Sequence, residues 1–177
     1  MCGIIGISSN KSVSANIINS LKKLEYRGYD SAGVATLFGG EINEVKSEGR
    51  VDKLEQNFDL KSLKGNIGIG HVRWATHGFP NSINAHPHSS DNVSVVHNGI
   101  IENSTILKKH LVNKGHTFKS QTDTEVIVHL ITENLKTMEL EEAITKTLKQ
   151  LHGSFALGII FKDIPDLIVG ARRGSPC

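Results

Sequence analysis

The stretch SAGVATLFGGEINEVKSEG, residues 31–49, contains two runs with the composition of β-strands, joined by Gly39-Gly40. A pair of glycines between two such runs is typical of a tight hairpin turn. We therefore predict two antiparallel neighbouring strands, SAGVATLF at 31–38 and EINEVKSEG at 41–49. They begin an antiparallel sheet, to which the rest of the chain can be added in both directions.

A strand and a helix are predicted before the hairpin. The run CGIIGIS at residues 2–8 is apolar enough for a buried strand. Between this run and the hairpin, apolar residues recur at the spacing of one helix face, at Ile17, Ile18, Leu21 and Leu24. We expect Ser12 to be the N-cap of this helix.

After the hairpin, strands and helices come in groups. A short helix is expected at 51–58, and buried strands are expected at NIGIGHVRW, NVSVVHNGII, GSFALGIIF and DLIVGAR. Three helices separate the second and third of these runs. One opens at Thr122, where Glu125 completes a capping-box pattern, and another spans Glu139 to Leu151 with a one-sided apolar stripe. This grouping favours an α+β sandwich over an alternating doubly wound sheet.

Length and charge narrow the classes of function. The chain has 177 residues, which fits one domain, and 20 basic against 18 acidic residues. Such a balance gives no large positive field, so neither nucleic acid nor a membrane surface is expected as a partner. The apolar runs are shorter than the roughly 20 residues of a membrane helix, and the amino terminus lacks the features of a signal peptide. We therefore expect a cytoplasmic protein.

The two cysteines, Cys2 and Cys177, stand at opposite ends and cannot form a disulfide framework. Removal of Met1 would give Cys2 a thiol and a free α-amine on the same residue. An α-amine with a pKa of about 7.7–8.0 can accept the thiol proton, so one residue would supply both nucleophile and base. Taken alone, Cys2 could equally be a small apolar side chain in an edge strand.

Four glycine-rich polar segments argue for the nucleophile: LEYRGYDSAG, GHVRWATHG, VVHNGIIEN and QTDTEV. Each follows an apolar run, so a sandwich could gather them at one rim of its sheets. Arg73 suits a carboxylate, and Asp123, expected in the first turn of its helix, suits an ammonium group, so the pair could bind an amino acid. Asn98 and Gly99 offer the donors of an oxyanion hole. The simpler alternatives are a helix-end charge for Asp123 and a turn for Asn98-Gly99.

The remaining candidates are histidines and the single tryptophan. Five histidines fall within 27 residues, at His71, His77, His86, His88 and His97. Their spacing matches no common zinc pattern, so we expect no metal, and His86-Pro87-His88 is interpreted as a rigid loop packed under the site. Trp74 is either part of a loop that closes over a ligand or an aromatic core anchor. No phosphate-binding glycine motif is present, so no cofactor is expected.

Together, MCGIIG, LEYRGYDSAG, GHVRWATHG, NAHPH, VVHNGIIEN and TDTEVI closely resemble the glutaminase domain of class II glutamine amidotransferases. EYRGYDSAG and RWATHG look like the glutamine–fructose-6-phosphate aminotransferase branch of that class. The resemblance runs from Cys2 to the ARRGSP segment at 171–176. It implies an N-terminal nucleophile hydrolase fold, a four-layer αββα sandwich, which agrees with the α+β prediction.

The resemblance also implies a role for each site residue. Cys2 would be the nucleophile, and Asn98 and Gly99 the oxyanion hole. The residues that would bind L-glutamine are Arg73, Thr76, His77, Asp123, Trp74 and Arg27. Within this set, Arg73 with Thr76 and His77 would hold the α-carboxylate and Asp123 the α-amino group, while the Trp74 loop would close over the substrate.

Members of this branch continue into a sugar-isomerase region, which uses the ammonia to convert fructose 6-phosphate to glucosamine 6-phosphate. We therefore expect residues 2–177 to be a glutaminase domain that lacks this region, and the full-length enzyme to be a homo-oligomer. Cys177 stands where the family usually has an aliphatic residue. Two alternatives remain open: a zinc amidohydrolase built on the histidines, and a non-catalytic domain that binds glutamine for regulation.

Overall fold

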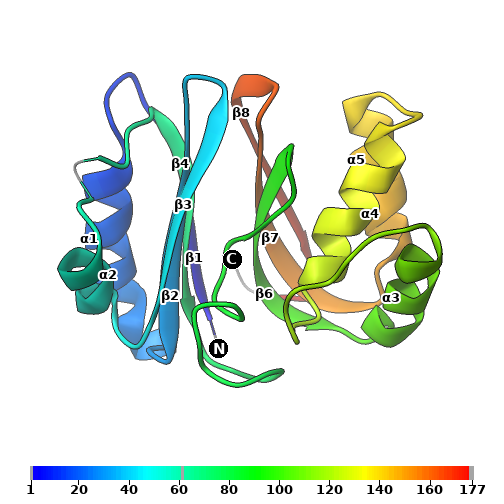
Figure 1. Ribbon diagram of the computed structural model, residues 1–177, viewed down its shortest axis with the longest axis horizontal. Helices are drawn as coiled ribbons and strands as arrows, with labels where there is room; N and C mark the ends of the chain where they lie inside the picture. The colour runs from blue at the N-terminus through cyan, green and yellow to red at the C-terminus, as the bar shows by residue number, and fades with distance from the viewer. Residues whose placement is uncertain (1, 61, 176–177) are drawn as a thin grey trace.

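Two four-stranded antiparallel sheets lie face to face at the centre of the computed structural model, which describes residues 2–60 and 62–175 (Figure 1). The first sheet has the order β1 (Gly3–Ser8), β4 (Ile67–Arg73), β2 (Ser31–Phe38) and β3 (Glu41–Glu48). The second has the order β5 (His88–Ser89), β6 (Val93–Ile101), β7 (Gly153–Phe161) and β8 (Ile164–Arg173).

Helices cover the outer face of each sheet (Figure 1). On the first sheet lie α1 (Ser14–Leu24), continued by the short 3-10 helix η1 (Glu25–Arg27), and α2 (Val51–Asn57). On the second lie α3 (Ser104–Asn113), α4 (Glu125–Leu135) and α5 (Leu140–Gln150). The layers are therefore helix, sheet, sheet and helix, which confirms the predicted αββα sandwich.

The hairpin of β2 and β3 has the predicted form. Phe38 pairs with Glu41, so the turn consists of Gly39 and Gly40 alone, with φ of 62° and 76°. A two-residue turn with positive φ at both positions matches the right-handed twist of the strands, and glycine adopts it without a steric penalty.

Successive residues of β4 point to opposite faces of the strand, so β4 packs against both the second sheet and the helix α1. Ile67 and Ile69 face the second sheet and pack with Val96 and Ile160. The opposite face carries Gly68 and Gly70, and a Cβ on Gly70 would lie 2.5 Å from the Ile17 side chain of α1. These glycines let α1 approach the sheet closely, because a side chain would hold the helix away.

Two helix starts differ from the prediction. α1 begins at Ser14 with Val13 as N-cap, not Ser12, and α4 begins at Glu125 with Thr124 as N-cap, not Thr122. Neither cap residue makes a side-chain capping bond. At α4 the Thr124 hydroxyl is bonded to His97 and His86 instead. The predicted capping box of Thr122 and Glu125 does not form, because the Glu125 carboxylate accepts the N–H groups of Lys119 and Ser120. In the described part of the chain, no helix has the length and apolar character needed to cross a membrane.

Candidate active site around Cys2

Cys2 lies at one end of the sandwich, directly before β1. The pairing of Gly3 with Val72 brings it beside the end of β4. There the Trp74 N–H donates to Cys2 Sγ across 3.3 Å, and Arg27 Nε donates to the Cys2 carbonyl across 3.0 Å. Burial raises the pKa of the Cys2 thiol, although the Trp74 N–H partly opposes this effect. At rest, Cys2 is therefore a protonated thiol that needs a base.

Asn98 and Gly99 are neighbours near the end of β6, paired with Ala156 and Phe155 of β7. Gly99 has a φ of 141°, and a Cβ there would lie 2.1 Å from the Ser154 carbonyl oxygen. Both the backbone conformation and the close approach of β7 therefore require glycine at this position.

The outer edge of β6 is only partly covered by β5, which pairs with Ser94 and Val95. Beyond these residues, side chains bind the outward backbone groups of alternate residues. The His97 N–H donates to His86 Nδ1 across 3.2 Å, and the Ile101 N–H donates to Asp123 Oδ2 across 2.7 Å. Gly99 lies midway between them, so strand alternation directs its N–H outward as well.

The carboxylate of Asp123 is thus tied to β6. Asp123 was expected in the first turn of a helix, but it lies two residues before α4 begins. Its side chain is 8% exposed. One carboxylate oxygen of Asp123 accepts the Ile101 N–H, so the carboxylate lies beside β6, the strand that also carries Gly99.

Arg73 ends β4 and is almost completely buried. Its terminal nitrogens donate to the carbonyls of His77, Gly78 and Phe79, so the guanidinium holds the loop that follows it. Trp74 is 49% exposed and meets the edge of the Tyr29 ring at 5.9 Å. It is therefore not an aromatic core anchor.

Two cavities meet at Cys2. One is small, has a volume of about 20 Å³, and is lined by Cys2, Arg73, Trp74, Thr76, His77, His86, His97, Gly99, Thr122, Asp123 and Thr124. The other is wider, about 360 Å³, and is lined by Cys2, Trp74, Thr76, Asn98, Gly99, Ile100, Ser154, Gly174 and Ser175. Every residue predicted for the site lines one of them except Arg27, which lies behind Cys2 and holds its carbonyl.

This clustering agrees with the comparisons. A family model described as a glutamine amidotransferase domain matches residues 73–173, more than half of the chain. The chain belongs to the glutamine amidotransferase domain family. The matched residues include seven of the predicted site residues that line the two cavities: Arg73, Trp74, Thr76, His77, Asn98, Gly99 and Asp123.

Individual relatives place this amidotransferase domain more closely. It is 55% identical over 177 residues to glutamine–fructose-6-phosphate aminotransferase (isomerizing) of Mesorhizobium japonicum, and 52% identical over 179 residues to the protein of that name from Pyrococcus horikoshii. Each alignment covers 99% of this chain but only 29% or 30% of the relative, so the chain spans less than a third of their length. The predicted resemblance is confirmed.

Solved structures agree on the fold. Glutamine phosphoribosylpyrophosphate amidotransferase of B. subtilis superposes with a TM-score of 0.81 at 31% identity, over 92% of this chain and 35% of that one. The predicted N-terminal nucleophile hydrolase architecture is confirmed by this match together with the layers described above.

Four histidines form a buried cluster beside the cavity of the amidotransferase domain. Burial lowers the pKa of His71 and of His88 to about 3, that of His97 to about 4, and that of His86 well below its usual value. All four are therefore neutral near pH 7. Among residues 2–60 and 62–175, no group of three or more His, Cys, Asp or Glu is arranged to hold a metal ion.

The sequence reasoning missed Asp30, which organises the start of the Trp74 loop. Its carboxylate accepts the Ala75 N–H, and its own N–H donates to the Arg73 carbonyl across 3.2 Å. Gly28 also packs closely against the end of β4, because a Cβ on Gly28 would lie 2.5 Å from the Arg73 carbonyl carbon. The signal was present in the EYRGYDSAG motif, from which only Arg27 was selected.

Proposed function

We propose that this chain hydrolyses the side-chain amide of L-glutamine at Cys2, giving glutamate and ammonia. One observation carries the proposal: Cys2, Gly99, Arg73 and Asp123 line one small cavity. These groups provide a nucleophile, an oxyanion donor and binding groups for both α-substituents of an amino acid.

The reaction begins with glutamine held at its two ends. Arg73, assisted by Thr76 and His77, binds the α-carboxylate, because a guanidinium matches a carboxylate with paired donors. Asp123 binds the α-ammonium with the carboxylate oxygen that does not accept the Ile101 N–H. The amide carbon is then directed toward Cys2.

The α-amine of Cys2, freed by loss of Met1, takes the thiol proton. The sulfur attacks the amide carbon, and a tetrahedral oxyanion forms that accepts hydrogen bonds from Gly99 N–H and the Asn98 amide. The terminal ammonium returns the proton to the leaving nitrogen, so ammonia departs and a glutamyl thioester remains. Water, deprotonated by the same amine, hydrolyses the thioester to glutamate and restores the thiol. No metal or cofactor enters these steps.

Entry of glutamine requires movement of the loop at residues 74–79. The smaller cavity, of about 20 Å³, has room for about one water molecule. Trp74, Thr76 and His77 form the part of its wall that is exposed to solvent, so they are the part able to move. Trp74 then closes over bound substrate and excludes bulk water.

The relatives support a proposal for the destination of the ammonia. Because they are glutamine–fructose-6-phosphate aminotransferases of more than three times the length, we propose that residues 2–177 are the glutaminase domain of such an enzyme. A sugar-isomerase region would combine the ammonia with fructose 6-phosphate to give glucosamine 6-phosphate, in a cytoplasmic homo-oligomer. This chain alone would release ammonia to solvent.

The decisive experiment is covalent labelling of the Met1-free chain with an electrophilic glutamine analogue, with and without excess glutamine, followed by peptide mass spectrometry. We expect one label at Cys2 that glutamine prevents, and none in a Cys2→Ser variant. Cys177 is an internal control for nonspecific reaction. Label at Cys177 alone would overturn the proposal, and glutamine binding without label or turnover would favour a regulatory domain instead. Loss of activity with a chelator would point to zinc chemistry.

A further inference from the structure

His86 contacts two different parts of the site with its two ring nitrogens. It lies in the segment between β4 and β5, is 5% exposed, and stacks on His71 with ring centroids 4.0 Å apart. Nδ1 accepts the His97 N–H across 3.2 Å, and Nε2 lies 3.3 Å from the Thr124 hydroxyl. His97 directly precedes Asn98-Gly99, and Thr124 directly follows Asp123.

The neighbours fix the position of each imidazole proton. A backbone N–H can only donate, so Nδ1 of the neutral His86 carries a lone pair and Nε2 carries the proton, which it donates to Thr124 Oγ1. The Thr124 hydroxyl then donates to His97 Nδ1, 2.8 Å away. His71 Nε2 donates to the His97 carbonyl across 2.9 Å, because a carbonyl can only accept.

These imidazoles occupy the place of a neighbouring strand. Since β5 begins at His88, opposite Val95, no strand in the described part of the chain covers this edge of β6 at His97, and both backbone groups of His97 are bound by side chains instead. The His86 segment is itself held against the first sheet, because its carbonyl oxygen stands 2.1 Å from where a Cβ on Gly33 would lie. The β6 edge that carries Gly99 is therefore fixed by the position of His86.

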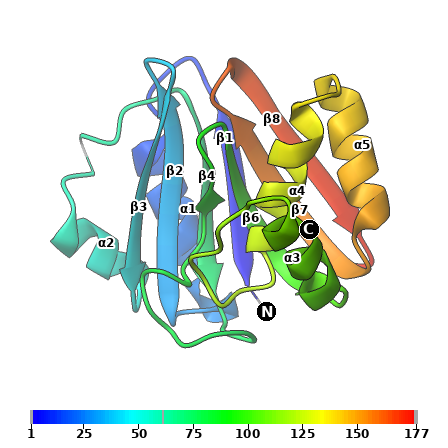
Figure 2. The same ribbon diagram turned by 45° about the vertical axis from the view of Figure 1, so that its right-hand side comes forward.

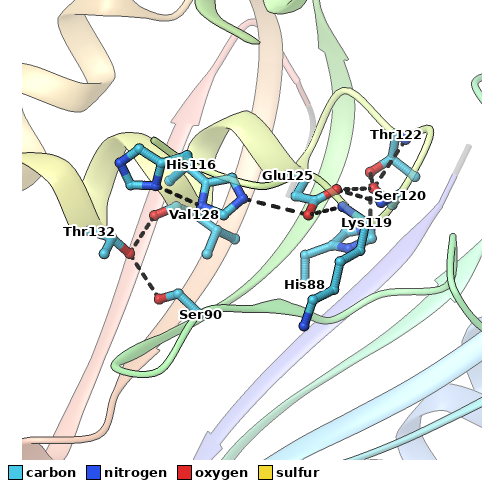
Figure 3. A network of polar contacts seen from close by, with 10 residues as sticks. His88, Ser90, His116, Lys119, Ser120, Thr122, Glu125, Val128 and Thr132 are labelled. Carbon is cyan, nitrogen blue, oxygen red and sulfur yellow. Dashed lines mark hydrogen bonds and ion pairs between the residues drawn. The ribbon is translucent and has the colours of Figure 1, made fainter. Parts of the chain in front are cut away.

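The segment around Asp123 is anchored on both sides. Thr124 binds His86 and His97, while the Thr122 hydroxyl lies 3.0 Å from His88 Nε2. Figure 3 shows how the chain before Thr122 is held in turn, with the Glu125 carboxylate bound to Lys119 and Ser120. Asp123 thus lies between two threonines whose hydroxyls meet buried neutral histidines.

We propose that His86 is a positioning residue that links the oxyanion donors at Asn98-Gly99 to the ammonium-binding carboxylate of Asp123. This role rests on the proposed hydrolysis of glutamine at Cys2. His86 does not touch the substrate; it sets the distance between the two groups that do, through His97 on one side and Thr124 on the other.

Two substitutions separate the two links. In His86→Asn, the amide oxygen stands near the position of Nδ1, so the bond from the His97 N–H is kept and the bond to Thr124 is lost. In His86→Gln, the longer side chain reaches the position of Nε2, so the bond to Thr124 is kept and the bond from His97 is lost. A net contribution typical of one hydrogen bond corresponds to about a two- to tenfold effect.

The experiment is steady-state glutaminase kinetics of both variants in the Met1-free chain. We expect His86→Asn to raise KM for glutamine with kcat near that of the unmodified chain, and His86→Gln to lower kcat with KM near normal. Thr124→Val keeps the side-chain shape and should raise KM; its effect should be smaller when added to His86→Asn, because the shared bond is already absent. His110→Ala, on the exposed face of α3, is the control and should change neither constant.

The outcomes distinguish the two proposals. If the unmodified chain does not hydrolyse glutamine, the proposed function fails, and this inference fails with it. If the chain is active but both variants fold and keep the kcat and KM of the unmodified chain, the positioning role is wrong while the proposed function stands. The same conclusion follows if both variants change kcat and KM in the same way. The positioning role is supported if His86→Asn changes mainly KM and His86→Gln changes mainly kcat. A purely structural defect would not separate the two constants according to which ring nitrogen was replaced.

Discussion

The backbone N–H of Trp74 donates to the sulfur of Cys2 across 3.3 Å, joining the end of β4 to the residue before β1. This contact favours the thiolate, whereas burial favours the thiol, and burial has the larger effect because the pKa of Cys2 is raised. The nucleophile is therefore held in place before it is activated, and its activation depends on a base.

The raised pKa predicts the pH dependence of alkylation. The thiolate is the reactive form, and its fraction grows only as the pH approaches the pKa of the thiol. The rate of Cys2 alkylation by iodoacetamide should therefore keep rising at pH values where the rate for an ordinary thiol has levelled off. The measurement is the rate from pH 6 to 10 by mass spectrometry, with a small free thiol as the reference. A plateau for Cys2 below that of the reference would contradict the raised pKa.

Asn98→Ala removes one proposed oxyanion donor. Loss of such a donor typically costs about 2.7–4 kcal/mol of transition-state stabilisation, so kcat should fall about 10²–10³-fold with little change in KM. Asn113→Ala, on an exposed residue at the end of α3, is the matched control. A variant with normal kcat would remove Asn98 from the oxyanion hole.

Gly99→Ala should damage both stability and activity. The φ of 141° alone costs an alanine about 1–3 kcal/mol, and the new Cβ would lie 2.1 Å from the Ser154 carbonyl oxygen, so β6 and β7 must separate. The expected result is a lower Tm and loss of glutaminase activity. Gly170→Ala on β8 is the control, since no atom lies within 4 Å of its added Cβ. Equal Tm values for the two variants would show that Gly99 has no special conformation.

Asp123→Asn tests the charge at the proposed ammonium site without removing the carbonyl-type acceptor for Ile101. A hydrogen bond to a charged group contributes about 1.5–3 kcal/mol, so KM for glutamine should rise about 10- to 150-fold while Tm stays near normal. Asp123→Ala, which also leaves the Ile101 N–H without its partner, should lower Tm as well. An unchanged KM in the asparagine variant would assign the α-ammonium to another group.

The buried histidines predict a loss of stability in mild acid. In the folded state the pKa values of His71, His88 and His97 lie at about 3 to 4, below the usual 6.5, so below pH 6.5 the unfolded chain binds more protons than the folded one. Stability therefore falls as pH falls, by up to about 1.4 kcal/mol per pH unit for each such histidine.

Urea unfolding at pH 7, 6 and 5 measures this slope. His88→Gln, which keeps an amide near the Thr122 hydroxyl but cannot bind a proton, should make the slope shallower. Replacement of the exposed His110 is the control and should leave it unchanged. A free energy of unfolding that does not depend on pH in this range would contradict neutral burial.

Local signals in the sequence were enough to predict the hairpin and most elements. Gly39-Gly40 fixes its turn through backbone conformation alone, and the apolar runs that became β4, β6 and β7 are largely buried as expected. The prediction of a buried strand at DLIVGAR is wrong, because β8 is the edge strand of its sheet and all its residues are partly or fully exposed. The capping pattern at Thr122 failed because Glu125 found stronger partners, the backbone N–H groups of Lys119 and Ser120, outside the helix.

The contacts within the site were harder to predict, because they join distant parts of the chain. Asp30 reaches Ala75 across 45 positions, and His86 reaches Thr124 across 38. Asp30 and His86 each lie in a motif, EYRGYDSAG and NAHPH, but neither motif indicates which distant residue its member contacts. The residues that meet the cavity could be selected from motifs, whereas those that fix its dimensions became visible only with the sheets assembled.

The shortness of β5 has one further consequence. A regular neighbour that continued four residues further along β6, from Val95 to Gly99, would bind the outward N–H of Gly99 in the ordinary ladder of the sheet, and this N–H would no longer be available to the oxyanion. The proposed oxyanion donor is therefore a backbone N–H that has no partner strand in the sheet. An insertion that extended β5 to the position opposite Gly99 would therefore remove the proposed oxyanion donor without altering any residue that touches glutamine.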